Sequence, residues 1–507
     1  MKLLMTIQDI SSWIKAAAPG AQLTSDSRRV QRGDVFFAYA GAAQFIDAAL
    51  KLGAAAIVHD DSVEWDAAPD LPHLAVPDLK RQAGPVAHAF YGMPDQAMFS
   101  AGVTGTNGKT SCALWLAQSL ARLGVTSSVI GTLGVGLCKA RGEIDFDVTG
   151  YTTPDAVLLA GKLAALRDAG AQAVAIEVSS IGLDQERAAG MHFDVAMFTN
   201  LTRDHLDYHG DMAAYEAAKV KLFDWPGLKT TVINLDDAMG LRLAAHVAGK
   251  PAGQYPVIGY TLQDAAGQPD LPGVLMLRAS QFRSRHAGTE FHLECPLGSA
   301  VVKTQLVGHF NISNALAVLG ALLAHGTPLR AALDALEALQ PAPGRMQQVG
   351  GQEAPMIVID YAHTPDALEK TLLALRQVAQ ERGGQLWCVF GCGGDRDPGK
   401  RPQMGAIAQL ADHVVVTSDN PRSEDPHAII KQIVAGMRKD GPQPQAIEDR
   451  AAAILSAIKH AAKPDVILLA GKGHEPYQEI KGKKLPFSDA DHAQLALSAR
   501  LTMMRTN

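Results

Sequence analysis

The most informative stretch of this chain is Gly102–Thr110, which reads Gly-Val-Thr-Gly-Thr-Asn-Gly-Lys-Thr. It lies between an apolar segment typical of a strand and a segment typical of a helix. Backbone N–H groups near Gly105 and Gly108 can point at phosphate oxygens from the helix N-terminus. Lys109 can neutralise terminal phosphates, and the hydroxyl of the last threonine can hold Mg²⁺. A tight turn alone needs neither side chain, so the stretch predicts a phosphate-binding loop.

Polar residues follow two apolar runs downstream of this loop, at 173–177 and 195–198. Ligands of open parallel sheets bind beyond the carboxyl ends of the strands, so these residues are candidates for a site. Glu177 ends the first run and could bind Mg²⁺, although a surface charge explains it equally well. Ser179 and Ser180 follow it directly.

The second run leads into residues 199–210, which read Thr-Asn-Leu-Thr-Arg-Asp-His-Leu-Asp-Tyr-His-Gly. So many polar groups after a buried strand have little packing value, which makes Asn200, Asp204 and His205 candidates for function. The order differs from the His-Arg-Asp of a kinase loop, and the two histidines lack the glutamate of zinc proteases. Lys219 follows in a helical segment, where the sequence alone favours a solvated charge.

Four more loops with charged residues follow predicted strands near the end of the chain. They read Asp-Tyr-Ala-His-Thr-Pro-Asp at 360–366, Gly-Cys-Gly-Gly-Asp-Arg-Asp-Pro-Gly-Lys-Arg at 391–401, Asp-Asn-Pro-Arg at 419–422 and Gly-Lys-Gly-His-Glu at 471–475. Thr364 is the predicted N-cap of the helix after the first loop. The other three loops together predict a site for a zwitterion, because guanidinium groups bind carboxylates and carboxylates bind ammonium. Each loop by itself could carry only surface salt bridges.

The apolar runs predict an α/β protein of three domains. Residues 1–98 alternate short strand-like and alanine-rich helical segments, which is typical of a small N-terminal α/β domain. Residues 99–338 continue as a central doubly wound, P-loop ATPase-like parallel sheet. Prolines and a glycine at 340–344 separate a C-terminal Rossmann-like α/β domain, residues 339–507. Its four expected strands are 356–360, 386–390, 414–417 and 466–470.

Composition excludes several classes of function. The chain has 507 residues, a net charge of −6 and no long basic run, so we expect no nucleic-acid partner. No apolar stretch approaches the roughly 20 residues that span a bilayer, and the N-terminus turns polar too early for a signal peptide. We therefore expect a cytoplasmic protein without membrane insertion. The five cysteines form no Cys-x-x-Cys pair, which favours buried reduced thiols over zinc ligands or disulfides.

Together and in this order, the motifs resemble those of the Mur ligase family over nearly the whole chain. The phosphate loop is similar to theirs and to that of their folylpolyglutamate synthase relatives, with Val103 where the common P-loop has glycine. The other motifs that carry the resemblance are Thr24-Ser-Asp-Ser-Arg28, Tyr151-Thr-Thr-Pro154, Glu177-Val-Ser-Ser180, residues 199–210, Asn311-Ile-Ser-Asn314, Gly344-Arg-Met346, Asp360-Tyr-Ala-His363 and Asp419-Asn-Pro-Arg422. In this family the N-terminal domain holds a uridine nucleotide, the central domain holds ATP and Mg²⁺, and the C-terminal domain brings the amino acid.

The resemblance implies roles for individual residues. ATP contacts are implied for Gly105, Thr106, Asn107, Gly108, Lys109, Thr110, Ser111, Asn311, Arg345 and Asp360. Contacts with UDP-MurNAc-L-Ala-D-Glu are implied for Ser25 and Ser27 at the uridine end, and for Thr152, Thr153, Ser179, Gln185 and Arg187 at the sugar-peptide end. Contacts with meso-2,6-diaminopimelate are implied for Arg396, Asp419, Asn420, Pro421, Arg422, Gly471 and Glu475.

The same resemblance implies a magnesium site and a catalytic set. Lys219 matches a lysine that is carbamylated in the family, which would make it an anionic metal ligand beside Thr110, Glu177 and His205. The implied catalytic residues are Lys109, Lys219 and His205. Two features depart from the family pattern: the loop after Gly41 is short, and Ile181 stands where histidine is common.

The implied reaction is ATP-driven amide formation in peptidoglycan precursor synthesis, carried out by a monomer. The γ-phosphoryl group of ATP activates the D-Glu γ-carboxylate as an acyl phosphate, which the diaminopimelate amine attacks. No side-chain nucleophile is needed, and we find no Ser-His-Asp or Cys-His arrangement. A folylpolyglutamate synthase is an alternative that leaves residues 24–28 and 419–422 unexplained. A P-loop switch without ligase activity is another.

Overall fold

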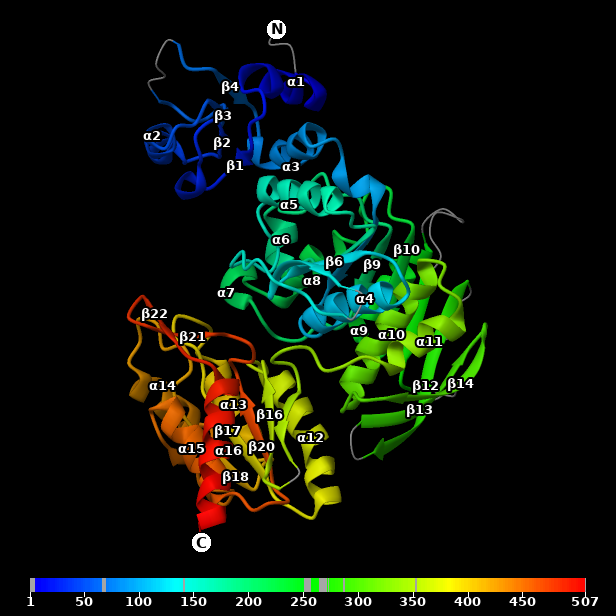
Figure 1. Cartoon of the computed structure of the whole chain (residues 1–507), viewed down its shortest axis with the longest axis vertical. Coiled ribbons are helices and arrows are strands. Elements are labelled where there is room, and N and C mark those ends of the chain that lie inside the picture. Colours follow the sequence, from blue (N-terminus) through cyan, green and yellow to red (C-terminus); the bar gives the residue numbers. More distant parts are fainter. Residues whose placement is uncertain are drawn as a thin grey trace.

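The computed structural model describes residues 5–65, 70–139, 142–249, 257–263, 271, 273–285, 288–351 and 353–506. These residues form three large sheets, one after another along the chain, and a separate two-stranded sheet. The large sheets lie in three bodies stacked from the N-terminus to the C-terminus (Figure 1). The domain limits expected at 98/99 and 338/339 fall between the sheets and stay predictions.

The first sheet is parallel and has four strands in the order β1-β2-β3-β4. Its elements are α1 (Ile7–Ala17), β1 (Leu23–Thr24), η1 (Ser27–Arg29), β2 (Val35–Ala38), η2 (Ala43–Phe45), α2 (Ile46–Lys51), β3 (Ala56–Asp60), β4 (His73–Val76), α3 (Leu79–Phe90) and η3 (Pro94–Ala97). Helix α3 packs on α5 of the next body, so the two cores adjoin (Figure 1).

The central sheet has ten strands in the order β14-β13-β12-β11-β10-β9-β5-β8-β6-β7. Its first half contains β5 (Phe99–Thr104), α4 (Lys109–Arg122), β6 (Ser127–Gly131), β7 (Gly134–Cys138), α5 (Ala156–Asp168), β8 (Ala173–Glu177), α6 (Ser180–Asp184), β9 (Val195–Phe198), α7 (Leu206–His209) and α8 (Met212–Val220). The second half contains β10 (Thr230–Asn234), α9 (Ala238–Ala248), β11 (Val257–Thr261), β12 (Val274–Arg285), β13 (Gly288–Cys295), β14 (Gly298–Thr304), α10 (His309–Ala324) and α11 (Leu329–Glu337).

Both faces of the central sheet are buried, as its continuous apolar strands predict. Along β9, Val195 and Met197 join the core under α4, α10 and α11, while Ala196 and Phe198 join the core under α5 and α9. The strands from β12 to β6 run parallel, which confirms the doubly wound prediction. β7 at one edge, and β13 and β14 at the other end of the sheet, pair antiparallel with their neighbours, and the sequence analysis did not foresee them.

The third sheet has six strands in the order β15-β16-β20-β17-β18-β19. Its elements are β15 (Gln347–Gly350), β16 (Met356–Asp360), α12 (Pro365–Arg382), β17 (Leu386–Phe390), α13 (Lys400–Ala408), β18 (His413–Val416), α14 (Pro426–Ala435), β19 (Gln445–Ala446), α15 (Arg450–His460), β20 (Val466–Ala470) and α16 (Asp489–Thr506). A separate hairpin consists of β21 (Tyr477–Ile480) and β22 (Lys483–Pro486).

The expectation of four strands in this sheet was wrong, because β15 and β19 are polar edge strands without an apolar run. The expectation for the cysteines holds for four of them, and Cys295 is partly exposed on β13. All five are free thiols.

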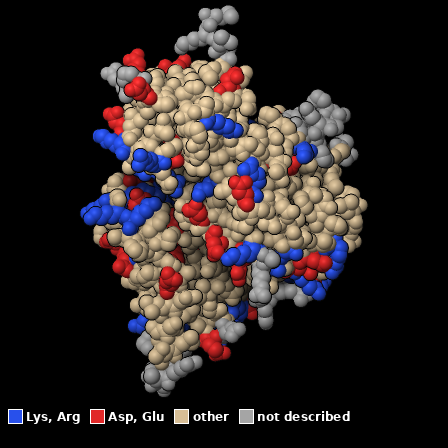
Figure 2. Space-filling model, turned by 45° about the horizontal axis from the view of Figure 1, so that its top comes forward, with Lys and Arg blue, Asp and Glu red and all other residues tan. Residues whose placement is uncertain are grey.

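Charges of both signs are interspersed on the face that Figure 2 shows, as the small net charge leads one to expect. In the described part of the chain, no helix has the length and apolarity that crossing a membrane requires.

Candidate active site

The phosphate loop joins β5 to α4 and closes tightly on its neighbours. Gly105 and Gly108 have φ angles of +150° and +88°, which favour glycine. A Cβ atom at Gly105 would collide with the Thr199 hydroxyl, and one at Gly108 would collide with the Asn314 side chain. Glycine is therefore favoured at both positions for two reasons: the positive φ angle and the lack of room for a Cβ atom. The backbone N–H groups of Thr106 and Asn107 donate to Asn200, at 2.8 Å to its O and 3.0 Å to its Oδ1, and α4 begins directly after the loop at Lys109. The N–H groups of the first turn of α4 therefore lie at the loop, as a phosphate cradle needs.

Lys109 folds back over this loop. Its Nζ donates hydrogen bonds of 2.8 Å to the carbonyl oxygens of Gly105 and Thr106. Burial lowers the pKa of the Lys109 ammonium, while the nearby carboxylates of Glu177 and Asp204 oppose this shift. The Lys109 amine therefore lies at the loop, within the electrostatic influence of two carboxylates.

Oxygen donors suited to Mg²⁺ gather at the first turn of α4. Thr110 Oγ1 donates to Glu177 Oε2 at 2.9 Å, and Arg345 Nη2 donates to Thr110 Oγ1 at 3.2 Å. Glu177 also accepts from the backbone N of Thr132 at 2.8 Å. A hydroxyl and a carboxylate in contact fit the oxygen chemistry of Mg²⁺. Among the described residues, no group of three or more His, Cys, Asp or Glu side chains could hold a metal by itself.

Lys219 is buried, with 1% of its surface exposed, near the end of α8. This overturns the solvated charge that its sequence context alone favoured. Its Nζ lies 4.3 Å from the centre of the Tyr215 ring. Burial and the positive charge of Lys109 hold the pKa of Lys219 well below its usual value. A neutral amine reacts with CO2 to give a carbamate and a proton, so this setting fits the carbamylated lysine that the resemblance implies.

His205 lies at the N-terminus of α7 with a left-handed φ of +54°. Its Nε2 is 3.5 Å from Asp204 Oδ2, and its side chain is 41% exposed. Partial burial lowers the pKa of His205, while Asp204 opposes that shift. A neutral imidazole can bind a metal ion. Asp204 also faces the third body, where its Oδ2 lies 3.9 Å from His363 Nε2.

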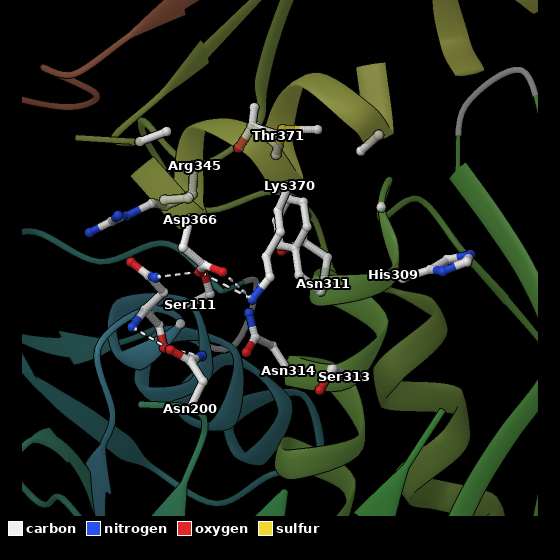
Figure 3. A pocket seen from close by; sticks show the side chains of 18 of the residues that line it. Ser111, Asn200, His309, Asn311, Ser313, Asn314, Arg345, Asp366, Lys370 and Thr371 are labelled. Atoms are coloured by element: carbon white, nitrogen blue, oxygen red, sulfur yellow. Dashed lines mark hydrogen bonds and ion pairs between the residues drawn. The ribbon is translucent and has the colours of Figure 1, made fainter. Parts of the chain in front are cut away.

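A cavity of about 490 Å³ opens between the central and C-terminal bodies beside the phosphate loop. Asn107, Gly108 and Ser111 line it from the loop and α4, and Asn311 lines it from α10. Figure 3 shows Arg345, Asp366, Lys370 and Thr371 approaching it from the C-terminal body. Asn107 Nδ2 donates to Asp366 Oδ2 at 3.4 Å, so the two bodies meet at this rim.

Arg345 and Asp360 lie at the C-terminal side of the same cavity. The Arg345 guanidinium stacks 4.4 Å from the centre of the Tyr361 ring. Asp360 accepts hydrogen bonds from the backbone N of Met346 at 2.8 Å and of Ala362 at 2.9 Å. Burial raises the pKa of the Asp360 carboxyl. The structure thus brings every residue of the expected ATP set to the loop or to this cavity.

The residues expected at the sugar-peptide end form one hydrogen-bonded group beyond β8. Thr153 Oγ1 lies 3.1 Å from Ser179 Oγ, and Arg187 Nη1 donates to Thr153 O at 3.1 Å. Gln185 Oε1 accepts from Arg187 Nη2 at 2.6 Å. Thr152 Oγ1 is 3.0 Å from Thr132 Oγ1, next to Glu177.

The residues expected at the uridine end are less closely connected. Ser25 Oγ donates to Asp155 Oδ1 at 2.6 Å, and Tyr39 OH donates to Asp155 Oδ2 at 2.9 Å. Asp155 also caps α5, so it links the first sheet to the central body. Within the described residues, no hydrogen bond joins Ser27 to the other expected contacts.

The residues expected at the amino-acid site come together around β18, β20 and the β21–β22 hairpin. Asn420 Nδ2 donates to Glu475 Oε2 at 2.9 Å. A Cβ atom at Gly471 would collide with the Asp419 carboxylate. Arg422 has a left-handed φ of +51°, and its Nε lies 3.3 Å from Glu479 Oε2.

Arg396 and Pro421 complete this set. Gly393 lies between the two guanidinium-bearing side chains, because an added Cβ there would lie 3.0 Å from Arg422 Nη1 and 3.9 Å from Arg396 Cγ. Arg396 is exposed and donates to the Asp395 carbonyl at 3.0 Å. Pro421 is buried, and its carbonyl packs against Gly394. The three zwitterion loops therefore converge as expected.

Comparisons with known proteins decide the family. The Mur ligase middle domain matches residues 103–322, and the Mur ligase glutamate ligase domain matches residues 344–473. The UDP-N-acetylmuramoyl-L-alanyl-D-glutamate–2,6-diaminopimelate ligase of Janthinobacterium sp. (strain Marseille) is 59% identical over 99% of each chain. The chain belongs to the Mur ligase family.

Other Mur ligases support this assignment. The ligase of the same name from Ralstonia nicotianae is 52% identical over 97% of this chain and 96% of its own. A solved structure of a ligase with that name matches with a TM-score of 0.65 and 36% identity over 94% of this chain and 95% of its own. The MurF ligase of Thermotoga maritima in complex with ADP matches over 96% of this chain and 98% of its own, with a TM-score of 0.64 and 18% identity, and so shares the fold. The interpretation as a Mur ligase of three-domain α/β fold is confirmed.

Sequence reasoning missed several residues of this Mur ligase site. Asn234, the last residue of β10, and Asp236 and Asp237, which follow the strand, line the cavity. The rule that identified Asn200 after β9 did not find them, because β10 reads Thr-Thr-Val-Ile-Asn and is not a continuous apolar run. Lys472 was read only as part of a motif, yet it is fully buried between Asn420 and Glu475.

Proposed function

We propose that this protein joins meso-2,6-diaminopimelate to the D-Glu γ-carboxylate of UDP-MurNAc-L-Ala-D-Glu, with ATP as the energy source, in peptidoglycan precursor synthesis. The observation that carries the proposal is 59% identity over 99% of the chain to a relative named for this ligation. Three parts of the site support it. The phosphate loop and its cavity suit ATP, the hydrogen-bonded group beyond β8 suits the sugar-peptide, and the loops around β18 and β20 suit the amino acid.

In the first step the substrate carboxylate attacks the γ-phosphorus of ATP, giving an acyl phosphate and ADP. The loop N–H groups and Lys109 hold the phosphates and stabilise charge on the moving phosphoryl group. Arg345 reaches Thr110 from the other body and adds a second positive charge near this point. The adenine end fits the cavity between Asn311 and the Asp360 loop, and a ligase of the same fold holds ADP.

Mg²⁺ would be held by Thr110, Glu177, His205 and a carbamate on Lys219, and when bound it would neutralise phosphate charge. The chain's own contribution is to place these donors beside the loop. Tyr215 anchors this arrangement, because its hydroxyl lies 3.0 Å from Thr106 Oγ1 while its ring lies under Lys219. Converting Lys219 from a possible ammonium to an anion removes its repulsion with Lys109.

In the second step an amine of diaminopimelate attacks the acyl carbon, the amine loses its proton and phosphate leaves. Arg422 is the proposed partner for the carboxylate that distinguishes diaminopimelate from lysine, since guanidinium and carboxylate can form two parallel hydrogen bonds. Asp419 and Glu475 are the proposed partners for ammonium. Asn420, Pro421, Gly471 and Arg396 shape and border this pocket.

The remaining substrate would lie across the first and central bodies. Thr152, Thr153, Ser179, Gln185 and Arg187 are the proposed contacts for the sugar-peptide, with Ser25 and Ser27 toward the uridine. We place this activity in the cytoplasm and expect a monomer.

An omission assay tests the proposal. Phosphate release from ATP should require both UDP-MurNAc-L-Ala-D-Glu and meso-diaminopimelate, and leaving out either should abolish it. Lys109→Ala should lower turnover on the order of 10³-fold, because a preorganised charge on the phosphoryl group is lost. Phosphate release that does not depend on the muropeptide would favour a P-loop switch and refute the proposed ligase activity.

A further inference from the structure

Lys472 lies in a turn that forces it inward. Gly471 and Gly473 on either side have φ angles of +110° and +56°, and a Cβ atom at Gly473 would approach the Tyr361 Cβ at 2.8 Å. The backbone N of Glu475 donates to Lys472 O at 3.1 Å and closes the turn. The lysine side chain is 0% exposed as a result.

Its ammonium group organises two of the residues proposed to bind the amino acid. Lys472 Nζ donates to Asn420 Oδ1 and to Glu475 Oε2, each at 3.1 Å. Asn420 Oδ1 also accepts from the backbone N of Glu479 at 2.9 Å. Two donors on Oδ1 fix the orientation of the amide, so Asn420 Nδ2 must face Glu475 Oε2, to which it donates.

These contacts divide the Glu475 carboxylate into two unlike oxygens. Oε2 accepts from both Asn420 and Lys472, whereas within the described residues Oε1 accepts no hydrogen bond. Burial and the neighbouring Asp419 raise the pKa of Glu475, and the Lys472 charge opposes that rise.

Burying a charged lysine costs free energy unless the charge is paired and hydrogen-bonded, as that of Lys472 is. An apolar side chain would fill the turn without that cost. It would also leave two buried carboxylates side by side, one of which would tend to take up a proton.

We propose that Lys472 is a positioning residue for the amino-acid substrate, which holds Asn420 and Glu475 so that Glu475 Oε1 receives a substrate ammonium group. This inference rests on the proposed function. It goes beyond it, because Lys472 acts through Glu475 and need not touch the substrate itself.

A double-mutant cycle tests the inference. The KM values for diaminopimelate, ATP and the UDP-dipeptide are measured for the wild type, Lys472→Met, Glu475→Gln and the double variant. Lys472→Met should raise the KM for diaminopimelate on the order of tenfold or more, with the other two KM values unchanged. In the Glu475→Gln background the same change should add nothing. Lys463→Met is the matched control, since Lys463 pairs with Glu353 on the surface.

Two results would overturn the inference: an unchanged KM for diaminopimelate in Lys472→Met, or an equal increase with and without Glu475. If Lys472→Met does not fold, the double variant removes both charges of the Lys472–Glu475 pair and its KM is compared with that of Glu475→Gln alone, where a higher value contradicts the inference. Wild-type protein that ignores diaminopimelate would refute the proposed function instead, so the two failures are distinguishable.

Discussion

Two buried lysines in this Mur ligase have opposite surroundings. Lys219, in the central body, is 1% exposed and faces an aromatic ring and the charge of Lys109. Lys472, in the C-terminal body, is 0% exposed and contacts a carboxylate and an amide oxygen. Within the described residues, the Lys472 amine thus donates hydrogen bonds to a carboxylate and an amide, whereas no hydrogen bond or ion pair involves the Lys219 amine, on which Asp204 acts only by its nearby charge.

The difference indicates what each amine can do. An ammonium group with a carboxylate partner keeps its charge and serves as a fixed donor. An amine without one is driven toward its neutral form, which is the form that reacts with CO2. We therefore assign reactivity to Lys219 and positioning to Lys472, and the following predictions test this division from the largest expected effect to the smallest.

Lys219→Ala should have the largest effect. Losing the proposed anionic ligand should lower turnover on the order of 10³-fold or more, and a small carboxylic acid in solution should restore part of the rate. The matched control is Lys221→Ala, because Lys221 is exposed and pairs with Asp184. Isotope-labelled bicarbonate should label the wild type but not Lys219→Ala. Full activity of Lys219→Ala would end the assignment.

Arg422→Ala should have the next largest effect. Removing the charged hydrogen bonds to the distal carboxylate should raise the KM for diaminopimelate on the order of a hundredfold, while ATP binding stays unchanged. Arg330→Ala, which changes an exposed helix pair, is the control. An Arg422→Ala variant with altered ATP binding and an unchanged KM for diaminopimelate would contradict the placement of Arg422 at the amino-acid site.

The pH dependence of diaminopimelate binding should reveal Glu475. Its pKa is raised by burial and by Asp419, so it takes up a proton at a pH where an ordinary glutamate is still ionised. As pH falls through this raised pKa, the ammonium partner is lost, and the KM for diaminopimelate should rise by up to about tenfold per pH unit. The KM for ATP and the Glu475→Gln variant provide flat references. A KM for diaminopimelate that is constant down to the range of an ordinary glutamate would contradict this role.

Thr364→Ala should have the smallest effect and should leave the surroundings of Lys219 and Lys472 unchanged. Thr364 caps α12 by accepting a hydrogen bond of 3.3 Å from the backbone N of Ala367. Its loss should lower the free energy of unfolding by about 1 kcal/mol in a denaturant titration. Thr364→Ser keeps the hydroxyl and should stay close to the wild type. Equal stability of Thr364→Ala and wild type would show that the cap contributes nothing.

Local sequence signals predicted the parts of the fold that depend on local chemistry. The strands at 173–177, 195–198, 356–360, 386–390 and 466–470 agree with the structure to the residue, because continuous apolar runs with polar ends mark buried parallel strands. The Thr364 cap and the first helical proline were also predicted as found. Polar edge strands such as β15 and β19 carry no such signal, since their positions depend on pairing with distant segments.

The site shows the same limit. Motifs indicated which residues gather at the phosphate loop and which gather around β18 and β20, but not which of their side chains are buried or paired. Lys219 and Lys472 illustrate this, because the surroundings of each depend on contacts between segments far apart in the chain. Lys472 contacts Asn420, which lies on a different loop, and sequence spacing gives no sign of that contact.

The most direct test of the central claim is a competition between meso-diaminopimelate and L-lysine in one reaction with ATP and UDP-MurNAc-L-Ala-D-Glu, read by the mass of the UDP-linked product. Lysine lacks the distal carboxylate and would leave the Arg422 guanidinium without its proposed substrate partner, so discrimination should reach several powers of ten. Nearly all of the product should carry diaminopimelate. Equal amounts of the two products would contradict it.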